Sequence, residues 1–310
     1  MKTPIPTTPP HSSQRGAALL ITMLIVVLGL VTLLTLRGGH KAPELEAQRK
    51  TALALAQAKE ALLGWAATDG VPTININPGR LLCPDQNNSG NSPGAICPSR
   101  LGRLPWKTLG LDDLRDGAGE RLWYIVDPAF LSSATAMNSA ILPTTLSFNG
   151  NNLVVVILSP GLALGALNQQ RDIANQNICT NYLESCASMP AIVSSAFPNT
   201  YNDHALFITA QEVFTLITRR MTRELALGIG TPPFPANLTA ANAIMGAGST
   251  WNENDWGITS PAASYVATDT SGGTNYNKIT LTYPNCSRQQ FTIQWNATMN
   301  TNIVSWTGAC

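Results

Sequence analysis

An uncharged apolar run near the N-terminus constrains this chain more than any other feature. Residues 17–36 carry no charged side chain, and residues 1–16, a polar segment rich in Pro, Ser and Thr, precede them. At about 1.5 Å per residue, a helix of this length spans roughly 30 Å, the thickness of the hydrocarbon core of a bilayer. The run therefore predicts a helix that crosses a membrane once.

An ordinary cleaved signal peptide fits this run poorly. The apolar stretch of such a peptide has about 7–15 residues and ends in a small-residue cleavage site. Here Leu36 is followed by the basic sequence Arg-Gly-Gly-His-Lys. Lys2 and Arg15 before the run balance Arg37 and Lys41 after it, so positive charge does not orient the helix.

The cysteines supply the missing orientation. They form an even set without the C-x-x-C pairs of zinc ribbons, which favours disulfides. Sequence leaves fifteen pairings open, but short loops close most easily. We therefore expect three local pairs and an oxidising compartment, the periplasm or the cell exterior, for the part after the run. The expected pairs are Cys83 with Cys97, Cys179 with Cys186, and Cys286 with Cys310.

The start of the apolar run carries a family resemblance. Residues 14–21, Gln-Arg-Gly-Ala-Ala-Leu-Leu-Ile, resemble the cleavage site of type IV prepilins and pseudopilins, in which a basic leader ends in Gly just before the apolar helix. The resemblance implies that a prepilin peptidase cuts between Gly16 and Ala17 on the cytoplasmic side. It also implies methylation of the new Ala17 amine and packing of residues 17–36 in a filament core. A plain single-pass anchor is the alternative.

One position departs from the family pattern. Most major pilins carry a glutamate five residues into the mature chain, where this sequence has Ile21. In the family that carboxylate is thought to pair with the N-terminal amine of a neighbouring subunit, and a buried amine without such a partner is costly. The departure resembles minor subunits, such as a tip or initiating subunit. The alternative is a subunit that never enters a filament.

The rest of the chain predicts an α+β fold. Residues 44–68 are strong helix formers with Pro43 in the first turn, and Leu55, Ala58, Leu62 and Trp65 form an apolar stripe. We expect a long N-terminal helix, with a transmembrane half and a packed half, joined to a disulfide-stapled, antiparallel β-rich globular head. The expected divisions are 1–16 leader, 17–36 transmembrane helix, 44–68 helix extending into the head and 69–310 exported head.

Within the head, several elements have clear local signals. Thr209 and Glu212 form a capping-box pattern before an amphipathic helix that stops near Gly228 or Gly230. Residues 230–248, rich in Pro, Asn and Ala, are the best candidate for a linker. Strand patterns cover residues 152–158, 206–208, 278–283, 290–296 and 302–306.

Three stretches in the first part of the head carry a second resemblance. Residues 78–85, 102–111 and 115–124 resemble a block in uncharacterised pilin-like exported proteins, a similarity that covers roughly the first 130 residues of the chain. Physically, their Trp, Tyr and Leu side chains predict core. The Arg and Asp residues between them predict ion pairs and turn caps.

An acidic cluster invites a calcium hypothesis. The spacing of its carboxylates does not match an EF-hand loop, and Arg115 and Arg121 can neutralise them, so we expect ion pairs and keep calcium as a minor alternative. We expect no other metal and no cofactor. The candidate calcium ligands are Asp112, Asp113, Asp116 and Glu120.

Catalysis and nucleic-acid binding have little support. His204, beside Asp203, is the one plausible catalytic histidine, but no nucleophile motif accompanies it, so we expect a turn residue and not an enzyme. The formal net charge of +1 lacks the basic footprint of nucleic-acid binding.

These patterns lead to one expected function and one alternative. The expected function is a minor pilin or pseudopilin-like subunit of a type IV pilus or a type II secretion-type filament, at the tip or in initiation. Its partners are the prepilin peptidase, other pilin-like subunits and the inner membrane, which holds it with a periplasmic head before assembly at the cell surface. The alternative is a membrane-anchored surface or periplasmic adhesin whose loop 251–256 presents exposed tryptophans.

Overall fold

The computed structural model describes most of the chain outside its N-terminus. The described residues are 22–29, 32, 42–68, 78–94, 96–131, 137–148, 151–184, 186, 202–257 and 264–310. Contacts within the chain separate two compact units, Met1–Arg49 and Lys50–Cys310. The second unit contains the whole predicted head.

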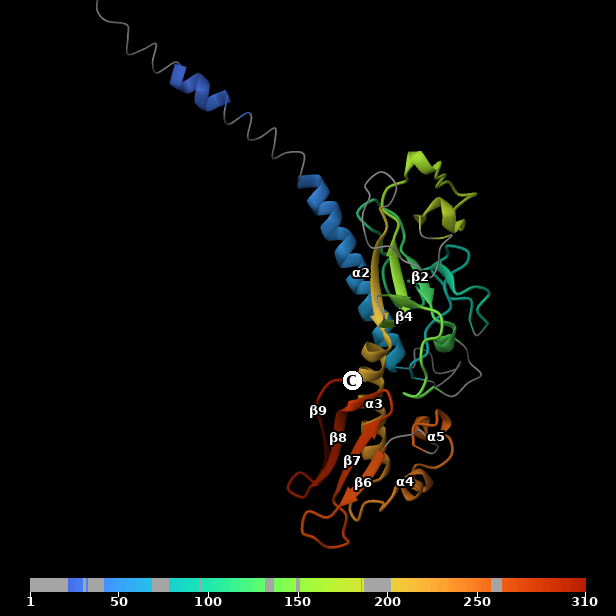
Figure 1. The fold of residues 1–310 in the computed structure, drawn as a ribbon, viewed down its shortest axis with the longest axis vertical. Coiled ribbons are helices and arrows are strands. Elements are labelled where there is room, and N and C mark those ends of the chain that lie inside the picture. The colour runs from blue at the N-terminus through green and yellow to red at the C-terminus, as the bar shows by residue number, and fades with distance from the viewer. Residues whose placement is uncertain are drawn as a thin grey trace, which may run out of the picture. The chain divides into compact units, whose positions relative to one another are not determined.

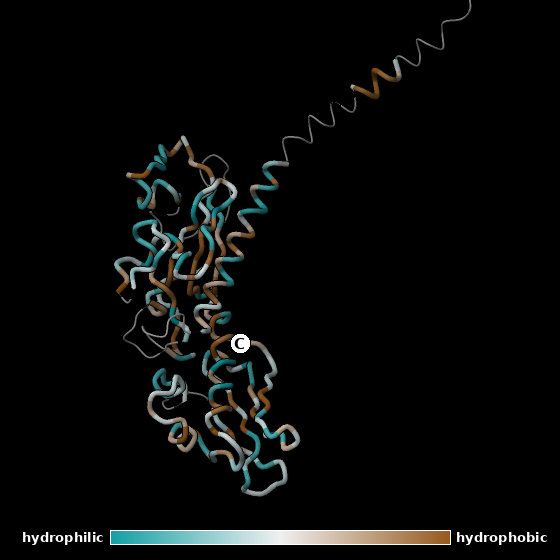
Figure 2. The backbone as a smooth tube through the Cα atoms, turned by 180° about the vertical axis from the view of Figure 1, so that it is seen from behind, coloured by the Kyte–Doolittle hydropathy of each residue, from teal (hydrophilic) through white to brown (hydrophobic). Residues whose placement is uncertain are grey.

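The first unit is described only in part. Residues 22–29 are helical with exposed side chains, and Figure 2 shows their apolar character in brown. Among the residues that the structure describes, no helix combines the length and the apolar character needed to cross a membrane. The predicted leader, the predicted cleavage site and most of the predicted span lie outside the described residues.

Helix α2 confirms the predicted helix that extends into the head. It runs from Ala42 to Thr68, with Pro43 in its first turn. Burial begins at Thr51, and from there the apolar stripe, including Ala58 and Leu62, lies in the main hydrophobic core. Trp65, which we expected in the stripe, is half-buried.

A five-stranded antiparallel sheet forms the first half of the head. Its central strand β4 pairs with β2, β3 and β5, and β1 pairs with β2. The strands predicted at 152–158 and 206–208 are confirmed as β4 and β5, whereas β1, β2 and β3 were not predicted. The strands are β1 Leu101–Arg103, β2 Trp123–Val126, β3 Ser147–Phe148, β4 Asn151–Ser159 and β5 His204–Thr209, with short 3-10 turns at Pro128–Phe130, Gly165–Leu167 and Cys179–Asn181.

Both faces of this sheet are buried. Successive side chains of a strand point to opposite faces. On β2, Tyr124 and Val126 belong to the main core with α2, while Trp123 and Ile125 belong to a second apolar cluster. That second cluster includes Tyr182, so the segment between β4 and β5 covers the far face of the sheet.

Helix α3, Ala210–Gly228, follows β5 directly and connects the two halves of the head. The predicted capping box is confirmed, since the Thr209 side chain accepts from the Glu212 N–H and the Glu212 side chain accepts from the Thr209 N–H. Figure 1 shows α3 running from the end of β5 to the second sheet. The helix ends at Gly228, as predicted.

A four-stranded antiparallel meander forms the second half of the head. Its strands are β6 Ser264–Thr268, β7 Lys278–Tyr283, β8 Cys286–Asn296 and β9 Thr301–Thr307, in that spatial order. Three of them confirm predicted strands, whereas β6 was not predicted. One face of the sheet packs on α3 through Ile279, Leu281 and Phe291 of the main core.

The predicted linker at 230–248 is wrong. These residues include α4, Leu238–Met245, which precedes α5, Thr250–Glu253. Phe234 and Ala241 are buried in the main core. The Pro- and Asn-rich composition reflects a turn and the Asn237 cap of α4, because Asn237 accepts a hydrogen bond from the Ala240 N–H.

The tryptophans of loop 251–256 are also placed differently from the surface-binding alternative. Trp251 and Trp256 are 0% and 1% exposed. Both pack edge-on against Tyr283 of β7. They are core residues of the second half, and the exposed aromatic loop expected for an adhesin is therefore absent at this position.

The predicted disulfides are confirmed. Cys83 pairs with Cys97, Cys179 with Cys186, and Cys286 with Cys310, which uses all six cysteines. The last pair joins the start of β8 to the C-terminal residue. Each bridge closes a loop within one local region of the head.

Candidate functional site

The candidate site is the joint between helix α2 and the head, where polar groups from several elements of the head meet the embedded part of the helix. We call the contacts of Thr51, Lys59 and Ala67 the helix joint. Thr51 and Lys59 bond through their side chains and Ala67 through its carbonyl oxygen. Between them lies the buried apolar stripe. The joint therefore spans the whole embedded part of α2.

The first contact meets an acidic turn. The hydroxyl of Thr51 accepts a hydrogen bond from the Gly117 N–H at 2.9 Å. Gly117 lies in the tight turn that follows Asp116, and Gly119 in the same turn has a φ of 85°, which favours glycine. The turn thus presents a backbone donor to the helix.

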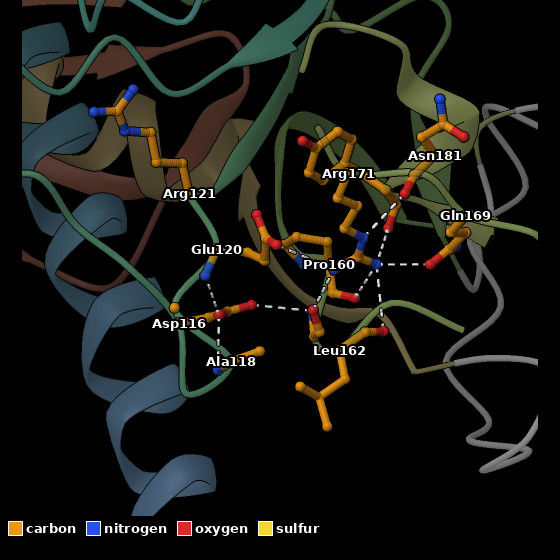
Figure 3. A network of polar contacts seen from close by, with 12 residues as sticks. Asp116, Ala118, Glu120, Arg121, Pro160, Leu162, Gln169, Arg171 and Asn181 are labelled. Carbon is orange, nitrogen blue, oxygen red and sulfur yellow. Dashed lines mark hydrogen bonds and ion pairs between the residues drawn. The ribbon is translucent and has the colours of Figure 1, made fainter. Parts of the chain in front are cut away.

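Asp116 holds this turn against the end of β4, as Figure 3 shows. One carboxylate oxygen accepts from the N–H groups of Ala118 and Glu120, at 2.9 and 2.8 Å. The other accepts from the Ser159 hydroxyl at 2.8 Å and the Gly161 N–H at 3.0 Å. Four donors satisfy this fully buried carboxylate.

Arg171 extends the network to the segment that covers the sheet (Figure 3). Its guanidinium donates to the carbonyl oxygens of Gly161 and Asn181, at 2.5 and 3.0 Å, and to Gln169 at 2.8 Å. Glu120 lies 3.7 Å away as its ion-pair partner. Arg171 therefore fixes the turn after β4 and the disulfide-closed turn near Cys179 together.

The second contact of the joint is an ion pair. Lys59 of α2 donates to Glu212 of α3 at 2.5 Å and to the Phe207 carbonyl oxygen of β5 at 2.9 Å. Glu212 also accepts from Thr209 in the capping box. Partial burial raises the pKa of Glu212, but the hydrogen bonds from Lys59 and Thr209 outweigh it and hold this pKa below its ordinary value. One carboxylate thus links α2, β5 and α3.

The third contact lies at the C-terminal end of α2. Arg220 of α3 donates to the carbonyl oxygen of Ala67 at 2.9 Å. The last carbonyl groups of a helix have no partner within the helix and carry its partial negative charge. A guanidinium at this place satisfies one of them and holds the helix end against α3.

Arg103 forms a buried stack on the far face of the sheet. It is 2% exposed, and its guanidinium carbon lies 4.3 Å from the ring centre of Trp123 and 3.9 Å from that of Tyr182. It donates to the carbonyl oxygens of Arg121 and Gln176 at 2.9 and 2.8 Å. Burial lowers the pKa of Arg103 to about 10, so it stays charged at neutral pH.

The acidic candidates separate in the structure. Asp113 pairs with Arg115 and Arg121, each with a shortest distance of 2.7 Å, and the hydrogen bond from Arg121 is the main cause that lowers the pKa of Asp113. Asp112 is exposed and Asp116 is occupied by its four donors. In the described part of the chain, no three His, Cys, Asp or Glu residues come together as a metal site.

His204 stands at the exposed start of β5. Ser159, its partner on the neighbouring strand β4, donates a hydrogen bond from its hydroxyl to Asp116. Asp203 accepts the N–H of Glu184 at 3.1 Å. His204 is therefore the first residue of a strand and not the turn residue that we expected, while Asp203 makes its hydrogen bond just before the strand begins.

The processing residues Gly16 and Ala17 lie outside the described residues, so their role stays a prediction. Comparison of the chain with protein-family models, with curated proteins and with solved structures finds no match.

Proposed function

We propose that this chain is a minor subunit of a type IV pilin-like filament, of the pilus or type II secretion kind. Residues 1–16 are the leader that a prepilin peptidase removes after Gly16. Residues 17–36 hold the mature chain in the inner membrane and later pack among other subunits. The head, beginning where α2 becomes buried, is exported to the periplasm and reaches the cell surface on assembly.

The observation that carries the proposal is the helix joint combined with the order of the sequence. A prepilin-like cleavage sequence comes first, an uncharged run of helical length second, and then α2, which is buried in the head from Thr51 onward. Hydrogen bonds at Thr51, Lys59 and Ala67 fasten that helix to three different elements of the head. Force on the helix would therefore be transmitted to the head as a whole.

Two features support a specialised position in the filament. Ile21 replaces the glutamate that most major pilins use to pair with a neighbouring amine. The head is also large, because unit two covers Lys50–Cys310 and holds two separate sheets. A bulky head without that pairing group suits a tip or initiating subunit better than a repeated shaft subunit.

The disulfides support export. Three bridges use all the cysteines of the chain, and such bonds persist in oxidising compartments. The buried tryptophans of loop 251–256 leave the adhesin alternative without the exposed aromatic residues that suggested it.

Shearing of cells tests the proposal. We expect the wild-type chain to be released with filament subunits, because cleavage frees the helix to leave the membrane. A Gly16→Val variant, whose branched side chain blocks the cleavage position, stays in the inner-membrane fraction. Ser13→Val, in the same leader but away from the cut, is the matched control and behaves as wild type. Equal release of all three chains contradicts the proposal.

A further inference from the structure

A basic hollow lies between α3 and β9 in the second half of the head. It has a volume of about 870 Å³, and three arginines and one glutamate of α3 line it together with Trp306 of β9. An adjoining hollow of about 460 Å³ shares Arg223 and Leu227 with it. We call the larger one the basic hollow.

Two arginines of this hollow share one indole ring. The guanidinium carbons of Arg219 and Arg223 lie 4.7 and 5.8 Å from the ring centre of Trp306. The two residues are four positions apart on α3, which places them on the same side of the helix one turn apart. Like charges at this spacing repel each other, so an anion bound between them would be stabilising.

Among the described residues, no carboxylate forms an ion pair with either of these two arginines. The ion pairs in this part of the chain involve Lys59, Arg115, Arg121 and Arg171 instead. The glutamate of the hollow, Glu224, accepts a hydrogen bond from the backbone N–H of Trp251 at 3.3 Å. The hollow therefore keeps an excess of positive charge.

An apolar side chain lies beside these charges. Leu227, one turn beyond Arg223, is 84% exposed and lines both hollows. Arginine binds carboxylates with two parallel hydrogen bonds, which gives both strength and direction. The surface thus offers two carboxylate-binding groups next to a contact for an apolar side chain.

We propose that the basic hollow is a docking site for an acidic segment of a partner protein. The segment presents two carboxylates about one helical turn apart, which bind Arg219 and Arg223, with an apolar residue that contacts Leu227. The proposal goes beyond the filament assignment and stands on the chemistry of the hollow alone. Failure of cleavage at Gly16 would leave it untouched.

A peptide-binding measurement on the full chain in non-ionic detergent tests it. The probe is a fluorescent helical peptide with two glutamates four residues apart and a leucine one turn beyond them, and its counterpart has glutamines in place of both glutamates. At low salt, we expect the glutamate peptide to bind at least about tenfold more tightly than the glutamine peptide. The difference should shrink as salt rises from about 0.05 M to about 0.5 M, because salt screens exposed charges.

Variants locate the binding. Arg219→Gln and Arg223→Gln should each weaken binding of the glutamate peptide about tenfold. Arg288→Gln, which removes an exposed charge of β8 outside the hollow, should leave it within about twofold. Arg223 is exposed, so its variant keeps the fold and tests the site even if Arg219→Gln unfolds. Equal affinity for both peptides, or equal losses in Arg223→Gln and Arg288→Gln, would overturn the proposal.

Discussion

Arg103 joins the covering segment to the sheet without a carboxylate partner. Its charge is balanced by two aromatic rings and two carbonyl oxygens. Cation–π contacts contribute up to about 2 kcal/mol each when water is excluded, and hydrogen bonds to a charged group about 1.5–3 kcal/mol. One side chain therefore stabilises two loops that lie far apart in sequence.

Replacing this arginine should be strongly destabilising. We expect Arg103→Ala to lower the free energy of unfolding by about 3–5 kcal/mol, because it leaves a cavity and two partly buried carbonyl groups without donors. Arg103→Lys should lose less, since it keeps the charge but not the planar stack. Arg100→Ala, which removes a partly exposed arginine bonded to Thr145, is the control and should cost less than about 1 kcal/mol. Urea unfolding measures all three, and equal losses would contradict the role of the stack.

Asp116 and Asp112 provide a second comparison, between a buried and an exposed aspartate of the same cluster. We expect Asp116→Asn to lower the free energy of unfolding by about 2–4 kcal/mol, because an amide cannot accept from all four donors of a buried carboxylate. Asp112→Asn should change it by less than about 0.5 kcal/mol, since Asp112 is exposed. Thermal unfolding with added calcium and with chelator distinguishes a metal site, in which both aspartates would matter, from the turn described here.

At the scale of elements, Glu212 connects two helices and a strand. It completes the capping box of α3 and binds Lys59 of α2, which also binds the β5 carbonyl oxygen. The start of α3 and the middle of α2 therefore depend on the same carboxylate. Loss of the ion pair should therefore also weaken the cap of α3.

A double-mutant cycle tests this connection. Lys59→Met and Glu212→Gln should each destabilise the head by about 1–2 kcal/mol, through the lost ion pair and the weakened cap. The double variant should lose about 0.5–1 kcal/mol less than the sum of the two, because both changes remove the same partly exposed ion pair. Strictly additive losses in chemical unfolding would show that the pair contributes nothing.

The pH dependence of stability should follow from the lowered pKa of Glu212. A carboxyl group whose pKa is lower in the folded state stabilises the fold above its unfolded pKa of about 4.3, and that contribution is lost as the pH falls through the folded value. We expect Glu212→Gln to lose less stability than wild type between about pH 5 and about pH 3. Glu60→Gln, on the exposed side of α2, should follow the wild-type curve.

The sequence correctly predicted those elements whose pattern depends only on residues close together in the chain. The capping box at Thr209 and the alternating pattern of β7 depend on neighbouring residues, and both are present in the structure. Strand β2 has no alternation, because all four of its residues are buried, and its aromatic residues indicated core without indicating a strand. In strand β6, half-buried residues alternate with exposed ones and none is fully buried, so the strand shows no clear apolar face.

The misread regions depended on contacts distant in sequence. The polar composition of residues 230–248 suggested a linker, but Phe234 and Ala241 are buried in the main core, and α4 packs against α3 and α5. The exposure of Trp251 and Trp256 could not be judged without Tyr283, which packs against both. The stack of Arg103 also needs Tyr182, far along the chain, so its sequence neighbours suggested only ion pairs and caps.

At the scale of the whole molecule, the disulfides reinforce separate parts of the head. The bridges have sequence separations of 14, 7 and 24 residues, and the longest one holds the C-terminus to β8. A longer closed loop loses more freedom in the unfolded chain. The last bridge should therefore contribute most to stability.

Removing the bridges one at a time tests this order. We expect the Cys286→Ser, Cys310→Ser double variant to lose about 3 kcal/mol and the Cys179→Ser, Cys186→Ser variant about 2 kcal/mol, from loop entropy. Thermal unfolding of the oxidised proteins measures both. A larger loss at the shorter loop would show that local packing near Tyr182, rather than chain entropy, sets the contribution of that bridge.

The central claim is that the apolar N-terminal run belongs to a processed, filament-forming subunit. Mass spectrometry of the N-terminal peptide, from cells with and without the prepilin peptidase, tests it most directly. We predict a mature chain that begins at a methylated Ala17 only when the peptidase is present, and an uncut chain without it. An N-terminus at Met1 in both kinds of cell would contradict the claim and leave a membrane anchor of another kind.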